Sequence, residues 1–217
     1  MLQIKSFTFN PFAENTYVLY DETGDALIID PGCYEKQEKG SLFDFVADKE
    51  LQPVKLINTH CHIDHVLGNA FVRSTYDIPL WYHKEEEAIL RAVSSYAPNY
   101  GFAQYQDSKA DHYIKEGEWI KFGNQQLLCI WVPGHSPGHL VFYEEKNRIC
   151  IGGDTLFKGS IGRTDLPGGD HETLLSAIKT KLFILPDEVI VYPGHGPETS
   201  IGEEKKNNPF VGKNSSV

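Results

Sequence analysis

The chain has 217 residues, of which 41% are hydrophobic, and its formal net charge is −10 at pH 7. This length and apolar content suit one domain over residues 1–217, while the acidic balance argues against nucleic acid or an anionic membrane, which are bound through clustered Lys and Arg. No apolar run can span a bilayer, the N-terminus lacks a secretory apolar segment, and the four cysteines show no paired spacing, so we expect a cytoplasmic protein with reduced thiols.

The first half of the chain is predicted to alternate strands and helices. Alternating or β-branched apolar residues indicate strands at 2–9, 16–20 and 26–30. A helix is predicted to begin near Ser41, because Asp44 stands three residues after this candidate N-cap. A strand at 54–59, a helix at 69–76, a strand at 78–83 and a helix at 84–96 are predicted to follow.

The second half is predicted to be richer in strands. Residues 97–112 combine Gly, Pro and aromatic residues without periodicity, which indicates a lid or a surface loop. Strands are predicted at 125–132, 139–145, 148–153 and 188–193, with an amphipathic helix at 171–183 and a short helix within 201–210. This order predicts an α/β protein in which sheets pack together with helices outside.

Potential metal ligands crowd the end of the strand at 54–59. The sequence NTHCHIDH places three histidines and an aspartate within six residues: His60, His62, Asp64 and His65. Side chains at i and i+2 of an extended segment point the same way, so His60 and His62 can approach one metal. A turn after them would let Asp64 and His65 face a second metal.

Three later loops add ligands of the same kind. Each follows a predicted strand directly and carries neighbouring glycines: His135 in PGHSPGH, Asp154 in GGDT and His195 in PGHG. Imidazole and carboxylate together suit borderline divalent metals. We therefore expect two divalent metals, with zinc favoured and iron or manganese possible.

At these motifs the chain resembles the metallo-β-lactamase-fold hydrolases, and within them the glyoxalase II-like (hydroxyacylglutathione hydrolase-like) group. THCHIDH matches the family signature T-H-x-H-x-D-H, and PGHSPGH, GGDTLF, GSIGRTDLPGGD and YPGHGPET follow in the family's order. The resemblance runs from roughly Phe9 to Phe210. It implies an αββα four-layer sandwich, with two mixed β-sheets flanked by helices and the site at one edge.

The resemblance also implies how the ligands divide. One metal would be held by His60, His62 and His135, the other by Asp64, His65 and His195, and Asp154 would bridge the two. A hydroxide shared by the metals and oriented by Asp64 and Asp154 would attack a small-molecule thioester such as S-lactoylglutathione. The helical C-terminal domain of full-length glyoxalase II enzymes has no counterpart here, so the chain resembles a compact form of the group. The dependence on glutathione and the oligomeric state are left open.

Several residues beside the ligands are candidates for supporting or substrate-binding roles. Asp30 is either a turn cap or a hydrogen-bonding support for a ligand imidazole, and Thr59 and His139 are candidates for similar support. Arg163 is the favoured substrate-binding cation, and an ion pair with Asp165 or Asp170 is its alternative role.

The main alternative function is a mononuclear iron persulfide dioxygenase, which shares the fold and the motifs. A β-lactamase is less expected, because those enzymes generally lack a bridging ligand at the position of Asp154. The charge of −10 argues against a tRNA-processing nuclease. A flavodiiron-type oxygen reductase needs Glu where His62 stands, and a metal-binding protein without turnover would not need so complete a ligand set.

Overall fold

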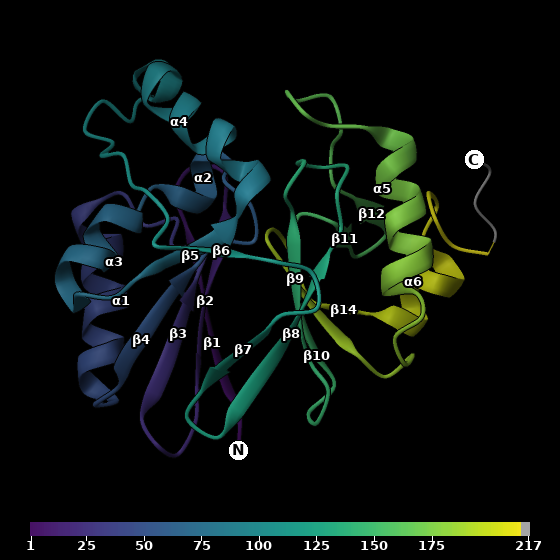
Figure 1. The fold of residues 1–217 in the computed structure, drawn as a ribbon, viewed down its shortest axis with the longest axis horizontal. Coiled ribbons are helices and arrows are strands. Elements are labelled where there is room, and N and C mark those ends of the chain that lie inside the picture. Colours follow the sequence, from purple (N-terminus) through teal and green to yellow (C-terminus); the bar gives the residue numbers. More distant parts are fainter. Residues whose placement is uncertain (214–217) are drawn as a thin grey trace. The chain divides into compact units, whose positions relative to one another are not determined.

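The computed structural model describes residues 1–213, which form two compact units. The first unit comprises Met1–Ile114 and Lys121–Gln126, and the second comprises Lys115–Ile120 and the residues from Leu127 onward. The chain forms two six-stranded mixed sheets, of which one lies in the first unit and the other mostly in the second, and helices accompany each sheet (Figure 1). Two mixed β-sheets flanked by helices were predicted, and this prediction is confirmed. The prediction of a single domain over residues 1–217 stays a prediction.

The first sheet has the strand order β1-β2-β3-β4-β5-β6. Its strands are β1 (Gln3–Phe9), β2 (Glu14–Tyr20), β3 (Asp25–Ile29), β4 (Gln52–Ile57), β5 (Leu80–His83) and β6 (His112–Ile114). The first three strands pair antiparallel, and β3 to β6 pair parallel. Parallel strands end at the same edge of a sheet, so the residues that follow β3 and β4 lie together there.

The helices of the first unit bury their apolar residues against this sheet. They are α1 (Lys36–Asp48), α2 (Ile63–Val66), α3 (Asn69–Tyr76) and α4 (Glu87–Tyr96), with 3₁₀ turns at Lys84–Glu86 and Ala97–Tyr100. Leu42 of α1, Val72 of α3 and Leu90 of α4 belong to one buried cluster with the sheet residues. In Figure 1, α1 and α3 lie side by side along the first sheet.

The predicted start of the first helix near Ser41 is wrong. The helix begins at Lys36, with Glu35 as its N-cap and Glu38 completing a capping box. Ser41 lies inside the helix, where its hydroxyl donates to the carbonyl of Gln37 at 2.9 Å. The carboxylate of Glu38 also accepts from the backbone N–H of Asn10, a contact with β1's end that a local pattern does not reveal.

The second sheet has the strand order β14-β13-β10-β9-β8-β7. Its strands are β7 (Trp119–Phe122), β8 (Gln125–Trp131), β9 (Leu140–Glu144), β10 (Ile149–Gly153), β13 (Ile190–Pro193) and β14 (Thr199–Ser200). The parallel pair β10 and β13 ends beside the loops that carry Asp154 and His195. A small antiparallel hairpin, β11 (Leu156–Phe157) and β12 (Ser160–Ile161), follows Asp154 directly.

Two helical segments cover this second sheet (Figure 1). The first is α5 (His171–Ala177), which continues as a π-helical segment at Ile178–Leu182, and the second is α6 (Ile201–Asn207). Leu174, Ile178 and Leu182 were predicted to share one helical face, and all three are fully buried in the core of this unit. The strands β6, β7, β11, β12 and β14 were not predicted, because they are short and, unlike the equally short β5 and β13, were not recognised as apolar runs.

All four cysteines are free thiols and all are buried. Among the described residues, no helix is both long enough and apolar enough to cross a membrane.

Candidate metal centre

The first unit gathers the ligands of the THCHIDH segment where β4 ends. After β4 ends at Ile57, the chain bends at Thr59 and continues to His62, which has an extended backbone and is the N-cap of the short helix α2. The ring centroids of His60 and His62 are 4.8 Å apart, and those of His60 and His65 are 4.2 Å apart. Asp64, in the first turn of α2, keeps one oxygen 3.6 Å from Nε2 of His65. One strand end and one helical turn thus bring four candidate ligands together.

Asp30 fixes the orientation of two of these imidazoles. Its carboxylate accepts hydrogen bonds from the backbone N–H of Thr59 at 2.7 Å, from the Thr59 hydroxyl at 2.6 Å and from Nδ1 of His65 at 3.1 Å. The Thr59 hydroxyl uses its only proton for Asp30, so it accepts from Nδ1–H of His60 at 3.0 Å. In both histidines Nε2 is therefore the nitrogen with a lone pair for a metal. This geometry favours the supporting role for Asp30 and for Thr59 over a role as a turn cap.

Asp30 holds a left-handed backbone conformation, with φ of 49°. A non-glycine residue in this region is uncommon and costs conformational energy unless its surroundings impose it. Asp30 directly follows β3, and the unusual φ turns its carboxylate toward the loop after the neighbouring strand β4.

Three buried polar residues of the first unit also hold the ligand segment, and the sequence analysis missed all of them. Glu86 accepts from the backbone N–H of Cys61 at 2.8 Å. Asn58 donates to the backbone carbonyl of His65 at 3.1 Å. Glu14 has an oxygen 3.9 Å from Nδ1 of His65, and burial raises the pKa of its carboxyl well above the usual range. Asn58 borders the histidine motif, whereas Glu14 and Glu86 lie in segments with no signal for a site.

The second unit gathers three further candidate ligands around one carboxylate oxygen. Oδ2 of Asp154 lies 3.6 Å from Nε2 of His135 and 3.5 Å from Nε2 of His195. Nδ1 of His135 donates to the backbone carbonyl of Arg163 at 2.7 Å, which leaves Nε2 as the nitrogen with the lone pair. A single carboxylate oxygen is thus placed between two imidazoles that come from different loops.

The loop after Asp154 leaves no room for a side chain at Gly162. A Cβ added there would lie 1.9 Å from the backbone oxygen of Asp154 and 3.1 Å from Nδ1 of His135. Because Gly162 has no side chain, its backbone can lie close to that of Asp154. The next residue, Arg163, then places its carbonyl where Nδ1 of His135 donates to it.

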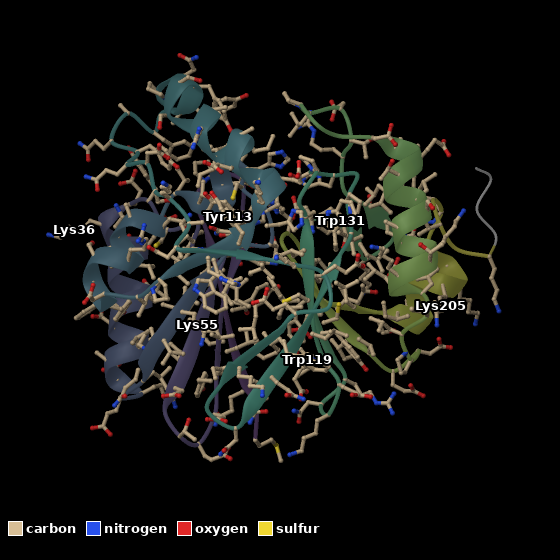
Figure 2. All side chains as sticks on the ribbon, viewed as in Figure 1. Lys36, Lys55, Tyr113, Trp119, Trp131 and Lys205 are labelled. Atoms are coloured by element: carbon tan, nitrogen blue, oxygen red, sulfur yellow. The ribbon has the colours of Figure 1, made fainter. Side chains whose placement is uncertain are left out.

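The Arg163 side chain is engaged with Asp165. Its Nε and one terminal nitrogen donate to the two oxygens of Asp165 at 2.7 and 2.8 Å, and both side chains are exposed. The ion pair with Asp165 that was considered beside substrate binding is therefore present. Lys205, which Figure 2 labels on α6, donates to Asp187 and to the carbonyl of Leu185.

The distances within each unit suit a divalent metal. A separation of 3.5–3.6 Å between imidazole Nε2 and carboxylate oxygen exceeds the length of a good hydrogen bond. Two ligands that each lie about 2.0–2.1 Å from a tetrahedral zinc are roughly 3.3 Å apart. Donor atoms of Asp30, His60 and His65 also lie within 4.8 Å of one another. We regard Asp30 as a support here, because its oxygens already accept three hydrogen bonds.

Comparison with known proteins gives one family. The profile described as the Metallo-beta-lactamase superfamily matches residues 9–195. A protein named hydroxyacylglutathione hydrolase GloC, from Haemophilus influenzae, is 34% identical over 99% of this chain and 100% of its own length.

Three solved structures are similar over nearly the whole chain. BLEG-1 B3 metallo-beta-lactamase is 36% identical with a TM-score of 0.88, covering 96% of this chain and 99% of its own. TTHA1623 in a di-iron-bound form is 34% identical with a TM-score of 0.84, covering 95% of this chain and 100% of its own. ETHE1 from Myxococcus xanthus is 26% identical with a TM-score of 0.79, covering 96% of this chain and 84% of its own.

Proposed function

The chain belongs to the metallo-beta-lactamase superfamily of metal-dependent hydrolases, and we propose that it hydrolyses thioesters of the glyoxalase II type. The proposal joins the two ligand sets in one centre for two divalent metals. His60, His62 and His135 would hold one metal, Asp64, His65 and His195 would hold the other, and Asp154 would be the ligand shared by both. Zinc is the favoured metal. Iron is the alternative, and the similar structure of TTHA1623 in a di-iron-bound form supports it.

The observation that carries this proposal is the position of Asp154. One of its oxygens lies at metal-sharing distance from the imidazoles of both His135 and His195. A carboxylate placed between two imidazoles suits a bridge in a two-metal site, which can stabilise both the attacking and the leaving group of a displacement. The end-to-end match to a protein named as a hydroxyacylglutathione hydrolase supports the thioester as substrate.

The chain's own residues prepare the site for this chemistry. Bound divalent metals supply Lewis acidity, which lowers the pKa of coordinated water toward 7 and polarises a carbonyl oxygen. The Nδ1 contacts of His60, His65 and His135 fix the orientation of these imidazoles, so that Nε2 is the nitrogen available to a metal. Water adds to the thioester carbonyl and the C–S bond breaks, which yields a carboxylic acid and a thiol. Asp64 and Asp154 have oxygens beside the ligand imidazoles, where they can orient the water and hold its proton.

Substrate recognition is proposed to depend weakly on glutathione. Lys205 of α6, a candidate cation for an anionic substrate, is engaged with Asp187. The sequence-based role of Arg163 in substrate binding remains part of the proposal, with its guanidinium exposed beside Asp165. A cytoplasmic location, likewise, stays a prediction from composition.

A persulfide dioxygenase is the second candidate, because ETHE1 shares the fold over almost the whole of this chain. The two activities differ in what they consume. Purified metal-loaded protein should release thiol from S-lactoylglutathione and from simple thioesters, without oxygen uptake on a glutathione persulfide. Oxygen uptake without thioester cleavage would overturn the proposal, and so would turnover of a cephalosporin alone.

A further inference from the structure

Aromatic side chains gather beside the ligand segment in the first unit. Phe12 lies in the turn between β1 and β2, and Tyr100 lies in the 3₁₀ turn after α4. Their ring centroids are 6.0 Å apart, and the Phe12 ring is 6.1 Å from that of Phe102. Phe102 is buried and packs edge-on against Tyr34 at 4.9 Å, so the Phe12 ring lies beside a side chain that is itself held in place.

The side chains of Phe12 and Tyr100 are exposed to solvent, although large aromatic rings are usually buried. Phe12 is 40% exposed and Tyr100 is 59% exposed, whereas most large apolar side chains of this unit are buried. Scattered exposed apolar residues are ordinary, but two exposed aromatic rings in contact, from segments far apart in the sequence, form a patch. We call the exposed rings of Phe12 and Tyr100 the aromatic patch.

The turn that presents Phe12 is tied to the metal-ligand segment. Nδ2 of Asn10 donates to the backbone carbonyl of Asp64 and to that of Gly32, each at 3.0 Å. Oδ1 of Asn10 accepts from the backbone N–H of Phe12 at 3.0 Å. One side chain therefore connects the backbone of Phe12 to the backbone of Asp64.

The same turn is strained. Asn10 and Ala13 both have positive φ values, 52° and 55°, a region that L-residues other than Asn and Asp rarely adopt. Such conformations persist where the surroundings impose them and gather at functional sites. Here the imposed shape places an exposed phenyl ring beside a metal-ligand loop.

Tyr96 links the patch to Asp64 from the other side. Its ring is 6.0 Å from that of Tyr100. Burial and, to a smaller extent, the charge of Asp64 raise the pKa of the Tyr96 hydroxyl to about 12. Tyr96 is therefore a neutral ring beside Tyr100 at the end of α4, and α4 packs against α2, the helix that carries Asp64.

We propose that Phe12 and Tyr100 determine specificity by binding the apolar group next to the reacting carbonyl. This inference rests on the proposed thioester hydrolysis and names its substrate class, thioesters that carry an apolar acyl chain or an apolar thiol. Aromatic rings offer a large apolar contact with few rotatable bonds, so they bind chains of methylenes without much loss of entropy. A wholly polar substrate would leave the aromatic patch exposed.

The test is a chain-length series that measures binding and does not require turnover. One arm titrates metal-loaded protein with straight-chain carboxylates from acetate to octanoate, and the other with thiols from ethanethiol to hexanethiol, each followed by calorimetry. A fully buried methylene strengthens binding about fourfold, so a surface that covers one side of the chain should give about twofold per methylene. We expect this slope in one arm for the wild-type protein, and that arm identifies the half of the substrate that meets the patch.

Amino-acid substitutions test whether the dependence of binding on chain length comes from the aromatic patch or from apolar surface elsewhere. Phe12→Ala and Tyr100→Ala should each reduce the slope toward no dependence on chain length, while acetate or ethanethiol binds as before. Phe12→Leu should restore most of the slope. Phe43→Ala is the matched control, because Phe43 is 46% exposed on α1 outside the patch, and its slope should equal that of the wild type.

Three results would overturn the inference. The first is a slope that is unchanged in Phe12→Ala and Tyr100→Ala. The second is the absence of any slope in the wild-type protein in both arms. The third is a dimer, detected by sedimentation, that Phe12→Ala dissociates, because the patch would then belong to a second copy of the chain. Failure of the proposed function gives a different pattern, in which no thioester is cleaved although the binding slopes are present.

Discussion

The backbone N–H of Asp154 donates a hydrogen bond of 2.9 Å to Nε2 of His139. His139 is fully buried and its acceptor nitrogen is used by the backbone, so it positions the candidate bridging residue Asp154. This relationship separates the two histidines of PGHSPGH by role, with His135 as a candidate ligand and His139 as a support for Asp154.

Substitutions at these two sites should therefore differ in severity. Asp154→Asn keeps the size of the side chain and removes its charge, so thioester hydrolysis should fall by orders of magnitude while the fold survives. His139→Ala should keep measurable activity and both metals, with a loss of about 10- to 100-fold, the range typical of groups that support a ligand. Steady-state kinetics, circular dichroism and elemental analysis of both variants check this. Wild-type-like activity in Asp154→Asn would remove Asp154 from the ligand set.

Asp30→Asn should weaken metal binding. The new amide would turn N–H groups toward the Thr59 and His65 donors that the carboxylate now accepts, so the orientation of His60 and His65 would be lost. We expect metal affinity to fall about 10- to 100-fold, measured by competition with a chelator of known affinity. Asp44→Asn is the control, because Asp44 is exposed on α1, and it should bind metal like the wild type.

Metal analysis tests the two-metal proposal directly. Protein loaded with excess zinc or iron and then desalted should contain near two equivalents per chain, with a metal–metal separation of about 3.5–4 Å in an experimental structure. A firm value of one equivalent, with Asp64 and His195 away from the metal, would favour the mononuclear dioxygenase instead.

Two glycine-to-alanine substitutions should have opposite effects. Gly162→Ala places a methyl group against the Asp154 backbone and the His135 ring, so it should lower both activity and metal occupancy. Gly40→Ala lies inside α1 with open space around the new methyl, and it should stabilise the protein by about 0.5–1 kcal/mol because glycine is a poor helix residue. Thermal unfolding and zinc content measure both effects. A Gly162→Ala protein with full zinc and full activity would show that the loop after Asp154 adapts freely.

Asp21 should make the stability of the first unit sensitive to acid. Burial alone would raise the pKa of its carboxyl, but hydrogen bonds from Thr23, Gln125 and the backbone N–H of Asn124 overcome this and lower the pKa well below the usual range. Because the folded-state pKa is depressed, the stabilisation is present at neutral pH and is lost as the pH falls below about 4.

Asp21→Asn should therefore cost about 1–3 kcal/mol at pH 7, since an amide cannot accept all of these bonds. The free energy of unfolding of the variant should also decline less between pH 5 and pH 3 than that of the wild type. Urea titrations at several pH values measure both quantities. Parallel pH profiles for the two proteins would rule out Asp21 as a source of the acid sensitivity.

The sequence by itself determined the candidate ligands and the elements that carry them. His60, His62, Asp64 and His65 stand within six residues, directly after an apolar run long enough to be recognised as a strand. His135, Asp154 and His195 follow similar runs, and the observed strands β8, β10 and β13 end close before these residues. Such signals are readable because periodicity, strand ends and ligand spacing are local properties of the chain.

The tertiary structure alone decided which residues hold these ligands in place. Asp30 reaches His65 across 35 positions and Asn10 reaches Asp64 across 54, and neither contact leaves a periodic trace in the sequence. The start of α1 at Lys36 depends on Glu38, whose carboxylate also accepts from the backbone of Asn10 at another part of the sheet edge. The physical reason is the same in each case. A hydrogen bond between distant segments forms only after β2, β3 and β4 have aligned, so its partners are selected by the folded sheet and not by their neighbours in the chain.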